Sequence, residues 1–192
     1  TYNSYQLYEC RSRRSQKRRI DATLMEMHTC VALCCERRVN EGMPHEKQMI
    51  SFMNNLKDTE KVRHYYSEKH KRCYTTDNKF VATIGKHLNE TLCLYCIGGV
   101  DEIIPNCSQI LNNGTVEKFN KDWQKKASQY SSLFQNTGRN IYALAMKVYD
   151  EGDNESGSKK HLWEGNLPKD LILLGMIQIS NNLKPEALIV LN

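Results

Sequence analysis

The sequence predicts an all-α protein: a disulfide-stapled helical bundle of about eight helices. Three observations support this fold class. Apolar residues recur every three to four positions through much of the chain, which is the period of an amphipathic helix. No convincing run of alternating apolar and polar residues indicates a strand. Eight cysteines among 192 residues provide an even number of thiols for pairing.

Four helices are predicted in the N-terminal half, over residues 20–39, 45–56, 58–72 and 78–96. Asp21 is a helix-start signal, and Pro44 suits the first position of the second helix. Gly98-Gly99 ends the fourth helix.

The remaining predicted helices cover residues 100–111, 116–134, 140–149 and 168–179. The first of these is interrupted near Pro105, and a turn at 112–115 precedes the second. Residues 151–158 form a polar loop, and Pro185 begins a last short turn.

The cysteines indicate disulfides rather than a metal site. A zinc site needs two close pairs, and Cys93-Leu94-Tyr95-Cys96 offers only one convincing pair. The segment from Cys30 to Cys35 has the composition of an apolar helix instead. We therefore expect no metal and no cofactor, and disulfides of open connectivity among Cys10, Cys30, Cys34, Cys35, Cys73, Cys93, Cys96 and Cys107.

Four N-x-[ST] sequons accompany the cysteines, at Asn89, Asn106, Asn113 and Asn154. Sequons and paired cysteines both belong to oxidising, extracellular compartments. The sequence therefore predicts a secreted, extracellular glycoprotein.

The cysteines also suggest how the chain is divided, because none follows residue 107. Residues 1–107 form a disulfide-rich basic helical unit in this prediction. Residues 108–192 form a cysteine-free helical unit packed on it. The short connection at 108–115 leaves open that both are one continuous domain.

A basic run lies near the N-terminus, with six positive charges in the nine residues from Arg11 to Arg19. Residues 1–73 hold 15 Lys and Arg against 9 Asp and Glu, so the excess positive charge lies there. The run suits a solvated surface, a polyanion-binding patch, a processing site or, least of all, a nucleic-acid contact. As a polyanion-binding patch it would consist of Arg11, Arg13, Arg14, Lys17, Arg18 and Arg19.

Catalytic motifs are missing from the sequence. It contains no H-E-x-x-H, no G-x-S-x-G and no G-x-x-x-x-G-K-[ST]. Adjacent carboxylates such as Asp101-Glu102 point apart on a helix and cannot act as a pair. We therefore expect no enzyme and no catalytic residues.

The cysteine spacing resembles that of insect odorant-binding proteins, a family that includes the D7 salivary proteins of blood-feeding flies. Cys10, Cys30, Cys34 and Cys73 are separated by 19, 3 and 38 residues, and the last two intervals carry the resemblance. The cysteines after Cys73 depart from the family spacing. The resemblance covers residues 10–107 and implies a secreted, helical protein with an apolar pocket for a small ligand.

Together these features predict a secreted, non-enzymatic binding protein. It would be a salivary-type or host-interacting effector that binds an extracellular protein or an acidic glycan. The alternative is a carrier of a small hydrophobic ligand in an apolar helical pocket. That pocket would be lined by Met25, Met49, Phe52, Met53, Phe80, Ile84, Phe119 and Trp123, which suit a packed core equally well.

Overall fold

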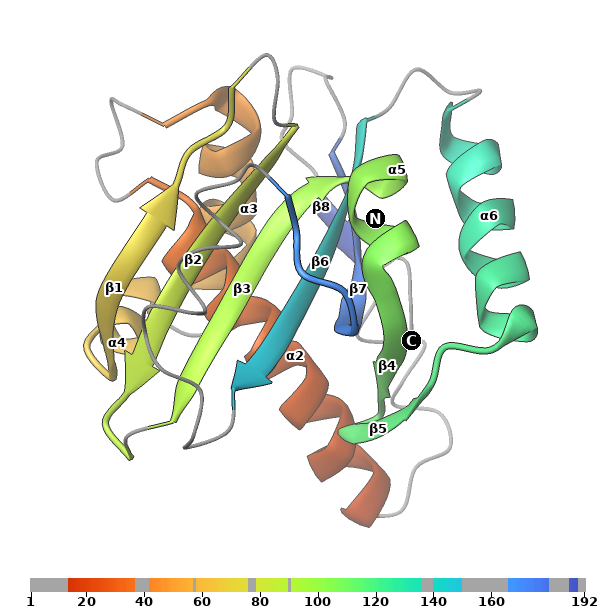
Figure 1. Cartoon of the computed structure of the whole chain (residues 1–192). Coiled ribbons are helices and arrows are strands. Elements are labelled where there is room, and N and C mark those ends of the chain that lie inside the picture. The colour runs from red at the N-terminus through yellow and green to blue at the C-terminus, as the bar shows by residue number, and fades with distance from the viewer. Residues whose placement is uncertain are drawn as a thin grey trace.

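An eight-stranded sheet with helices on both faces forms this protein in the computed structural model (Figure 1). The structure describes residues 14–36, 42–56, 58–75, 79–89, 91–135, 140–149, 166–179 and 187–189. Seven strands follow the order β1-β2-β3-β6-β7-β4-β5, and β8 pairs with β7. Neighbouring strands are antiparallel, except that β4 and β7 are parallel. The predicted all-α fold is therefore wrong.

The strands are β1 (Tyr66–Arg72), β2 (Phe80–His87), β3 (Leu92–Gly99), β4 (Cys107–Asn112), β5 (Thr115–Lys118), β6 (Asn140–Tyr149), β7 (Leu171–Ile179) and β8 (Ala187–Ile189). The helices are α2 (Arg14–Cys34), α3 (Pro44–Asn54), α4 (Thr59–Arg63), α5 (Val100–Ile103), the short 3₁₀ helix η1 (Ile104–Asn106) and α6 (Lys121–Gln135).

Some of the predicted helices are present, and others are strands. The helix predicted over 45–56 is confirmed as α3, and α2 replaces the one predicted over 20–39. The segments 78–96, 140–149 and 168–179 contain strands instead. These strands are buried over most of their length, so their apolar residues form nearly continuous runs. Periodicity alone does not separate such a run from a buried helix.

The predicted turn at 112–115 is confirmed as the hairpin connection between β4 and β5. Asn113 and Gly114 both have positive φ, of 47° and 75°. This is the conformation that Asn-Gly adopts in a two-residue hairpin turn.

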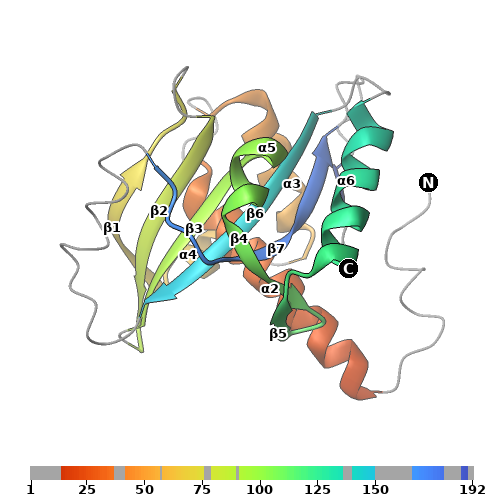
Figure 2. The same cartoon turned by 45° about the vertical axis from the view of Figure 1, so that its right-hand side comes forward.

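Two cores lie on the two faces of the sheet. Helices α2, α3 and α4 cover one face, and α5 and α6 lie on the other (Figures 1 and 2). Tyr95 and Ile97 of β3 face α2, whereas Leu94 and Cys96 join the opposite core. Both halves of the predicted division contribute strands to this one sheet.

A buried polar network joins α2 to the sheet. The hydroxyl of Tyr95, which is 1% exposed, donates a hydrogen bond of 2.9 Å to Oε2 of Glu26. The hydroxyl of Tyr66 lies 3.4 Å from that of Tyr95. Burial raises the pKa of Glu26, while its bond from Tyr95 opposes this shift. The network therefore fixes the position of α2 against β3.

Candidate functional site

A pocket lies where the C-terminal end of α2 meets the start of α3 and the ends of several strands. We call it the α3 pocket. Its walls combine aromatic rings, one lysine, one carboxylate and apolar core side chains. They come from Cys34, Cys35, His45, Glu46, Met49, Tyr74, Lys79, Val81, Ile97, Gly98 and Tyr142.

The start of α3 places two polar side chains at the α3 pocket. Pro44 occupies the first turn of the helix, where its missing N–H costs no helical hydrogen bond. The Glu46 carboxylate accepts a 2.8 Å hydrogen bond from the backbone N–H of Met43. This contact closes the first turn and holds His45 and Glu46 beside the strand ends.

An aromatic stack forms one wall of the pocket. The rings of His45 and Tyr142 lie 4.8 Å apart between centroids, with an angle of 15° between their planes. Tyr142 belongs to β6, in the middle of the sheet, so the stack ties the start of α3 to a well-supported strand. Tyr74, from the connection between β1 and β2, adds a third ring that is 46% exposed.

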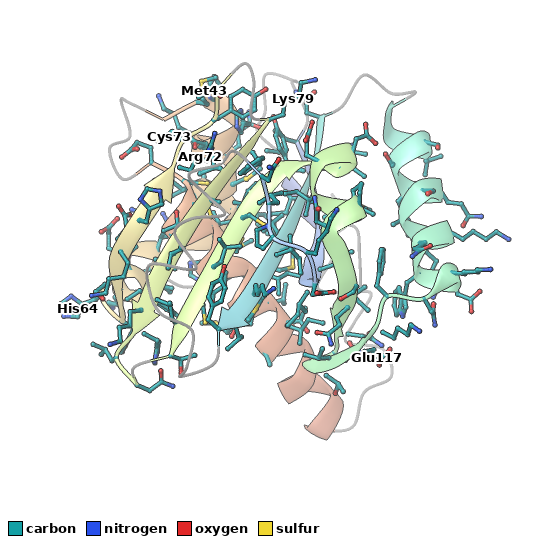
Figure 3. All side chains as sticks on the ribbon, in the orientation of Figure 1. Met43, His64, Arg72, Cys73, Lys79 and Glu117 are labelled. Carbon is teal, nitrogen blue, oxygen red and sulfur yellow. The ribbon has the colours of Figure 1, made fainter. Side chains whose placement is uncertain are left out.

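The lysine reaches the pocket from the same connection. Lys79 immediately precedes β2, and its carbonyl accepts a 3.3 Å hydrogen bond from the N–H of Gly99. Figure 3 shows Lys79 at the same end of the sheet as Met43 and Cys73. A Cβ on Gly98 would lie 2.8 Å from the Lys79 carbonyl oxygen, so only glycine permits this close approach.

Burial dominates the electrostatics of the pocket. It lowers the pKa of His45, while the charge of Glu46 opposes this shift. It raises the pKa of Tyr142, and the nearby Tyr74 and Glu46 raise it further. It also raises the pKa of Cys35 well above its ordinary value, so this thiol is protonated at neutral pH. The acidic and basic side chains of the pocket are Glu46, which is half-buried, and Lys79, which is exposed.

A second hollow, of about 250 Å³, lies beside the end of α2. It is lined in part by Arg63 and Lys71, which both donate to the carbonyl of Cys35, at 3.1 and 3.4 Å. Arg63 also donates to the carbonyl of Ala32, and it pairs with Glu60. Arg63 and Lys71 therefore donate hydrogen bonds to the carbonyls at the end of α2. These hydrogen bonds explain why the two cations lie here, so no bound ligand is needed to account for them.

The structure divides most residues of the predicted apolar pocket between two cores. Met49, Phe52 and Met53 pack on the α2 face of the sheet. Phe80, Ile84, Phe119 and Trp123 belong to the core on the opposite face, and Met25 is 36% exposed. The sheet separates the two groups, so these residues are packing residues of two cores. Met49 alone among them lines the α3 pocket.

The seven described cysteines are free thiols, where the sequence predicted disulfides. Cys93 and Cys96 lie three positions apart on one strand, so their side chains project to opposite faces. On α2, the thiols of Cys30 and Cys34 donate to backbone carbonyls of β3, at 3.4 and 3.3 Å. Cys10 lies outside the described residues.

The predicted polyanion patch stays a prediction. Arg11 and Arg13 lie outside the described residues. Arg14, Lys17, Arg18 and Arg19 belong to the N-terminal part of α2, whose side chains the structure does not describe.

Glycosylation likewise stays a prediction. Asn89 is exposed between β2 and β3, and Asn113 lies in the hairpin turn. The Asn106 side chain donates to the carbonyl of Glu102 at 2.8 Å and accepts from Lys169 at 2.7 Å. Asn154 lies outside the described residues.

Sequence analysis missed the polar residues of the α3 pocket. They come from two separate segments, His45-Glu46 and Tyr74 to Lys79, and form no short catalytic or binding motif. Two features of the sequence pointed toward the pocket. Pro44 marks the start of α3, and Gly98 marks the close approach of the β3 backbone to Lys79 and Phe80, where a helix end was predicted.

Within the described residues, no three side chains of His, Cys, Asp or Glu are grouped to hold a metal ion. No helix of the described chain combines the length and the apolar character needed to cross a bilayer.

Comparison with known proteins identifies the family. No curated protein matches the chain. The family model "P-type ATPase, cytoplasmic domain N" matches residues 23–186, which include α3, every strand but β8, and all of the α3 pocket. The matched family is a domain of an ATPase, so the chain is related to an enzyme.

This match and the sheet-rich fold correct three predictions. The resemblance to odorant-binding and D7 salivary proteins is wrong, because it rested on cysteine spacing within a helical fold that the chain lacks. The predicted function as a salivary-type effector is wrong for the same reason, and so is the alternative as a small-ligand carrier. The chain belongs to the family of P-type ATPase cytoplasmic N domains.

Proposed function

We propose that this chain binds an adenine nucleotide in the α3 pocket, as the N domain of a P-type ATPase. The composition of the pocket carries the proposal: aromatic rings, a lysine and a carboxylate surround an apolar floor at one end of the sheet. The family description supports it, because the substrate of an ATPase is ATP.

Each wall of the pocket suits one part of the nucleotide. Tyr74 and Tyr142 offer aromatic faces on which a purine can stack. The Glu46 carboxylate can accept a hydrogen bond from the amino group of adenine. Lys79, exposed at the rim, is a cation for the phosphate chain. The ring faces and the lysine together favour a nucleotide over an uncharged apolar ligand.

The role of the chain in catalysis is a separate part of the proposal. The family is one domain of an ATPase, so we assign binding to this chain and turnover to the whole ATPase. The prediction that the chain alone is not an enzyme therefore stays a prediction. Phosphate release from ATP by the isolated chain would contradict it.

We also propose a cytoplasmic location in place of the predicted secretion. The family description supports this location, and a reducing compartment suits the seven free thiols. The predicted partners, an extracellular protein or an acidic glycan, would then have no access to the chain.

Calorimetric titration of the chain with ATP and with adenosine tests the proposed binding. We expect Lys79→Ala to weaken ATP binding by about tenfold, because a charge-assisted contact contributes about 1.5 kcal/mol. Adenosine lacks phosphates, so its affinity should change little. Lys47→Ala is the matched control, since Lys47 is exposed on α3 and does not line the pocket. Equal losses in both variants, or no ATP binding by the unaltered chain, would refute the proposal.

A further inference from the structure

The α3 pocket is nearly filled by its own side chains. Its free volume is about 20 Å³, which is room for about one water molecule. Ligand sites that enclose a small molecule are typically about 300 Å³ or larger. A purine therefore enters only if a lining side chain moves.

The burial of the lining residues shows which side chain can move. Cys34, Cys35, Met49 and Ile97 are core residues that are 0–6% exposed, so displacing them would open a void in the core. Tyr74 and Lys79 are already at the surface. Four lining residues are half-buried: His45, Glu46, Val81 and Tyr142. Among them, only His45 carries a ring on the first turn of α3, outside the paired strands of the sheet.

The His45 ring covers one of the aromatic faces on which a base could stack in the pocket. It lies nearly parallel to Tyr142, at 4.8 Å between ring centroids. A purine stacked on the same face of Tyr142 would need the same layer of space. Burial lowers the pKa of His45, so a neutral ring occupies this layer at neutral pH.

We propose that His45 acts as a built-in competitor for the nucleotide base, by occupying the stacking face of Tyr142 until a base displaces it. His45 then determines the affinity and selectivity of the pocket. A ligand binds only if its stacking on Tyr142 is more favourable in free energy than the stacking of His45. This inference rests on the proposed nucleotide site.

Two substitutions at His45 test the competition in opposite directions. His45→Ala removes the ring, so adenosine and ATP should both bind about three- to tenfold more tightly, as expected from the strength of one aromatic stack. His45→Phe retains a flat ring and makes it more apolar, so both ligands should bind more weakly than to the unaltered chain. His64→Ala is the control, since Figure 3 shows His64 at the opposite end of the sheet.

A spectroscopic measurement follows the displacement directly. The ring protons of His45 experience the ring current of Tyr142 while the two are stacked. Saturation of the unaltered chain with adenosine should remove that shift in proton NMR and leave the ring protons of His64 unchanged. A shift that persists in the adenosine-bound chain would overturn the proposal.

The outcomes separate this inference from the proposed function. Adenosine binding that is unchanged or weaker in His45→Ala would overturn the competitor role and leave the nucleotide site intact. Failure of the unaltered chain and of every variant to bind ATP or adenosine would overturn both. Detectable binding by the unaltered chain together with tighter binding by His45→Ala would support both.

Discussion

Gly98 lines the α3 pocket at a position with no room for a side chain. An added Cβ would lie 2.7 Å from the Cβ of Phe80 and 2.8 Å from the carbonyl oxygen of Lys79. Phe80 is the first residue of β2, the strand that pairs with β3, and Lys79 immediately precedes it. A backbone atom held in this pairing can move aside only at a cost in stability. The side chain is therefore excluded by packing, with no requirement for positive φ.

We expect Gly98→Ala to lower the free energy of unfolding by about 1–3 kcal/mol, the usual cost of overpacking. Urea denaturation should show a lower midpoint with an unchanged m-value. Gly99→Ala is the matched control, because its nearest neighbour is a Glu102 side-chain atom at 3.8 Å, an ordinary contact. Equal stability of the two variants would show that β2 shifts to accommodate the methyl group.

At the scale of the element, α2 depends on residues from other parts of the chain. Its last carbonyls accept hydrogen bonds from Arg63 of α4, Lys71 of β1 and Thr83 of β2. These groups are otherwise orphaned at a helix end, and buried carbonyls need a partner. The end of α2 is therefore set by tertiary contacts and not by a local stop signal.

Replacement of Arg63 by methionine tests this dependence. The change removes the donors to Ala32 and Cys35 while it keeps an unbranched side chain of similar length. Arg63 is 5% exposed, so we expect a loss of about 2–5 kcal/mol in the free energy of unfolding. Lys61→Met is the control on the same helix, where the side chain is exposed. A loss below about 0.5 kcal/mol in a urea titration of Arg63→Met would contradict the capping role.

Strand β7 shows why the sequence predicted a helix where the structure has a strand. Its nine residues, Leu171–Ile179, are almost all buried, since β6, β4 and β8 flank it and both faces are covered. Apolar residues are required on both faces, so the alternation that marks a strand disappears. α3 keeps one polar face, and its amphipathic period identified it correctly.

For the whole molecule, the cysteines contribute to packing on both faces of the sheet. Cys30, Cys34, Cys35 and Cys93 join the α2-side core, and Cys96 joins the opposite one. Burial raises the pKa of Cys93 to about 11 and that of Cys107 to about 12. Thiolates are the reactive form, so these groups are unreactive while the protein is folded.

We expect one fast-reacting thiol when a Cys10→Ser variant is treated with a thiol reagent at pH 8. That thiol is Cys73, which is exposed, and the other six should react only after unfolding. A Cys73→Ser variant should lose the fast phase. Fewer than seven thiols after unfolding without reductant would indicate disulfides and return an extracellular location to consideration.

The sequence by itself determined local features: the α3 helix, the Asn-Gly turn, the distribution of charge and the even number of cysteines. These depend on neighbours within a few positions, where capping, turn chemistry and the helical period act. Only the tertiary structure decided that the long apolar runs are strands, that cysteines three positions apart face different cores, and that His45, Tyr74, Lys79 and Tyr142 share one pocket. Strand pairing joins residues distant in the chain, and no local period records it.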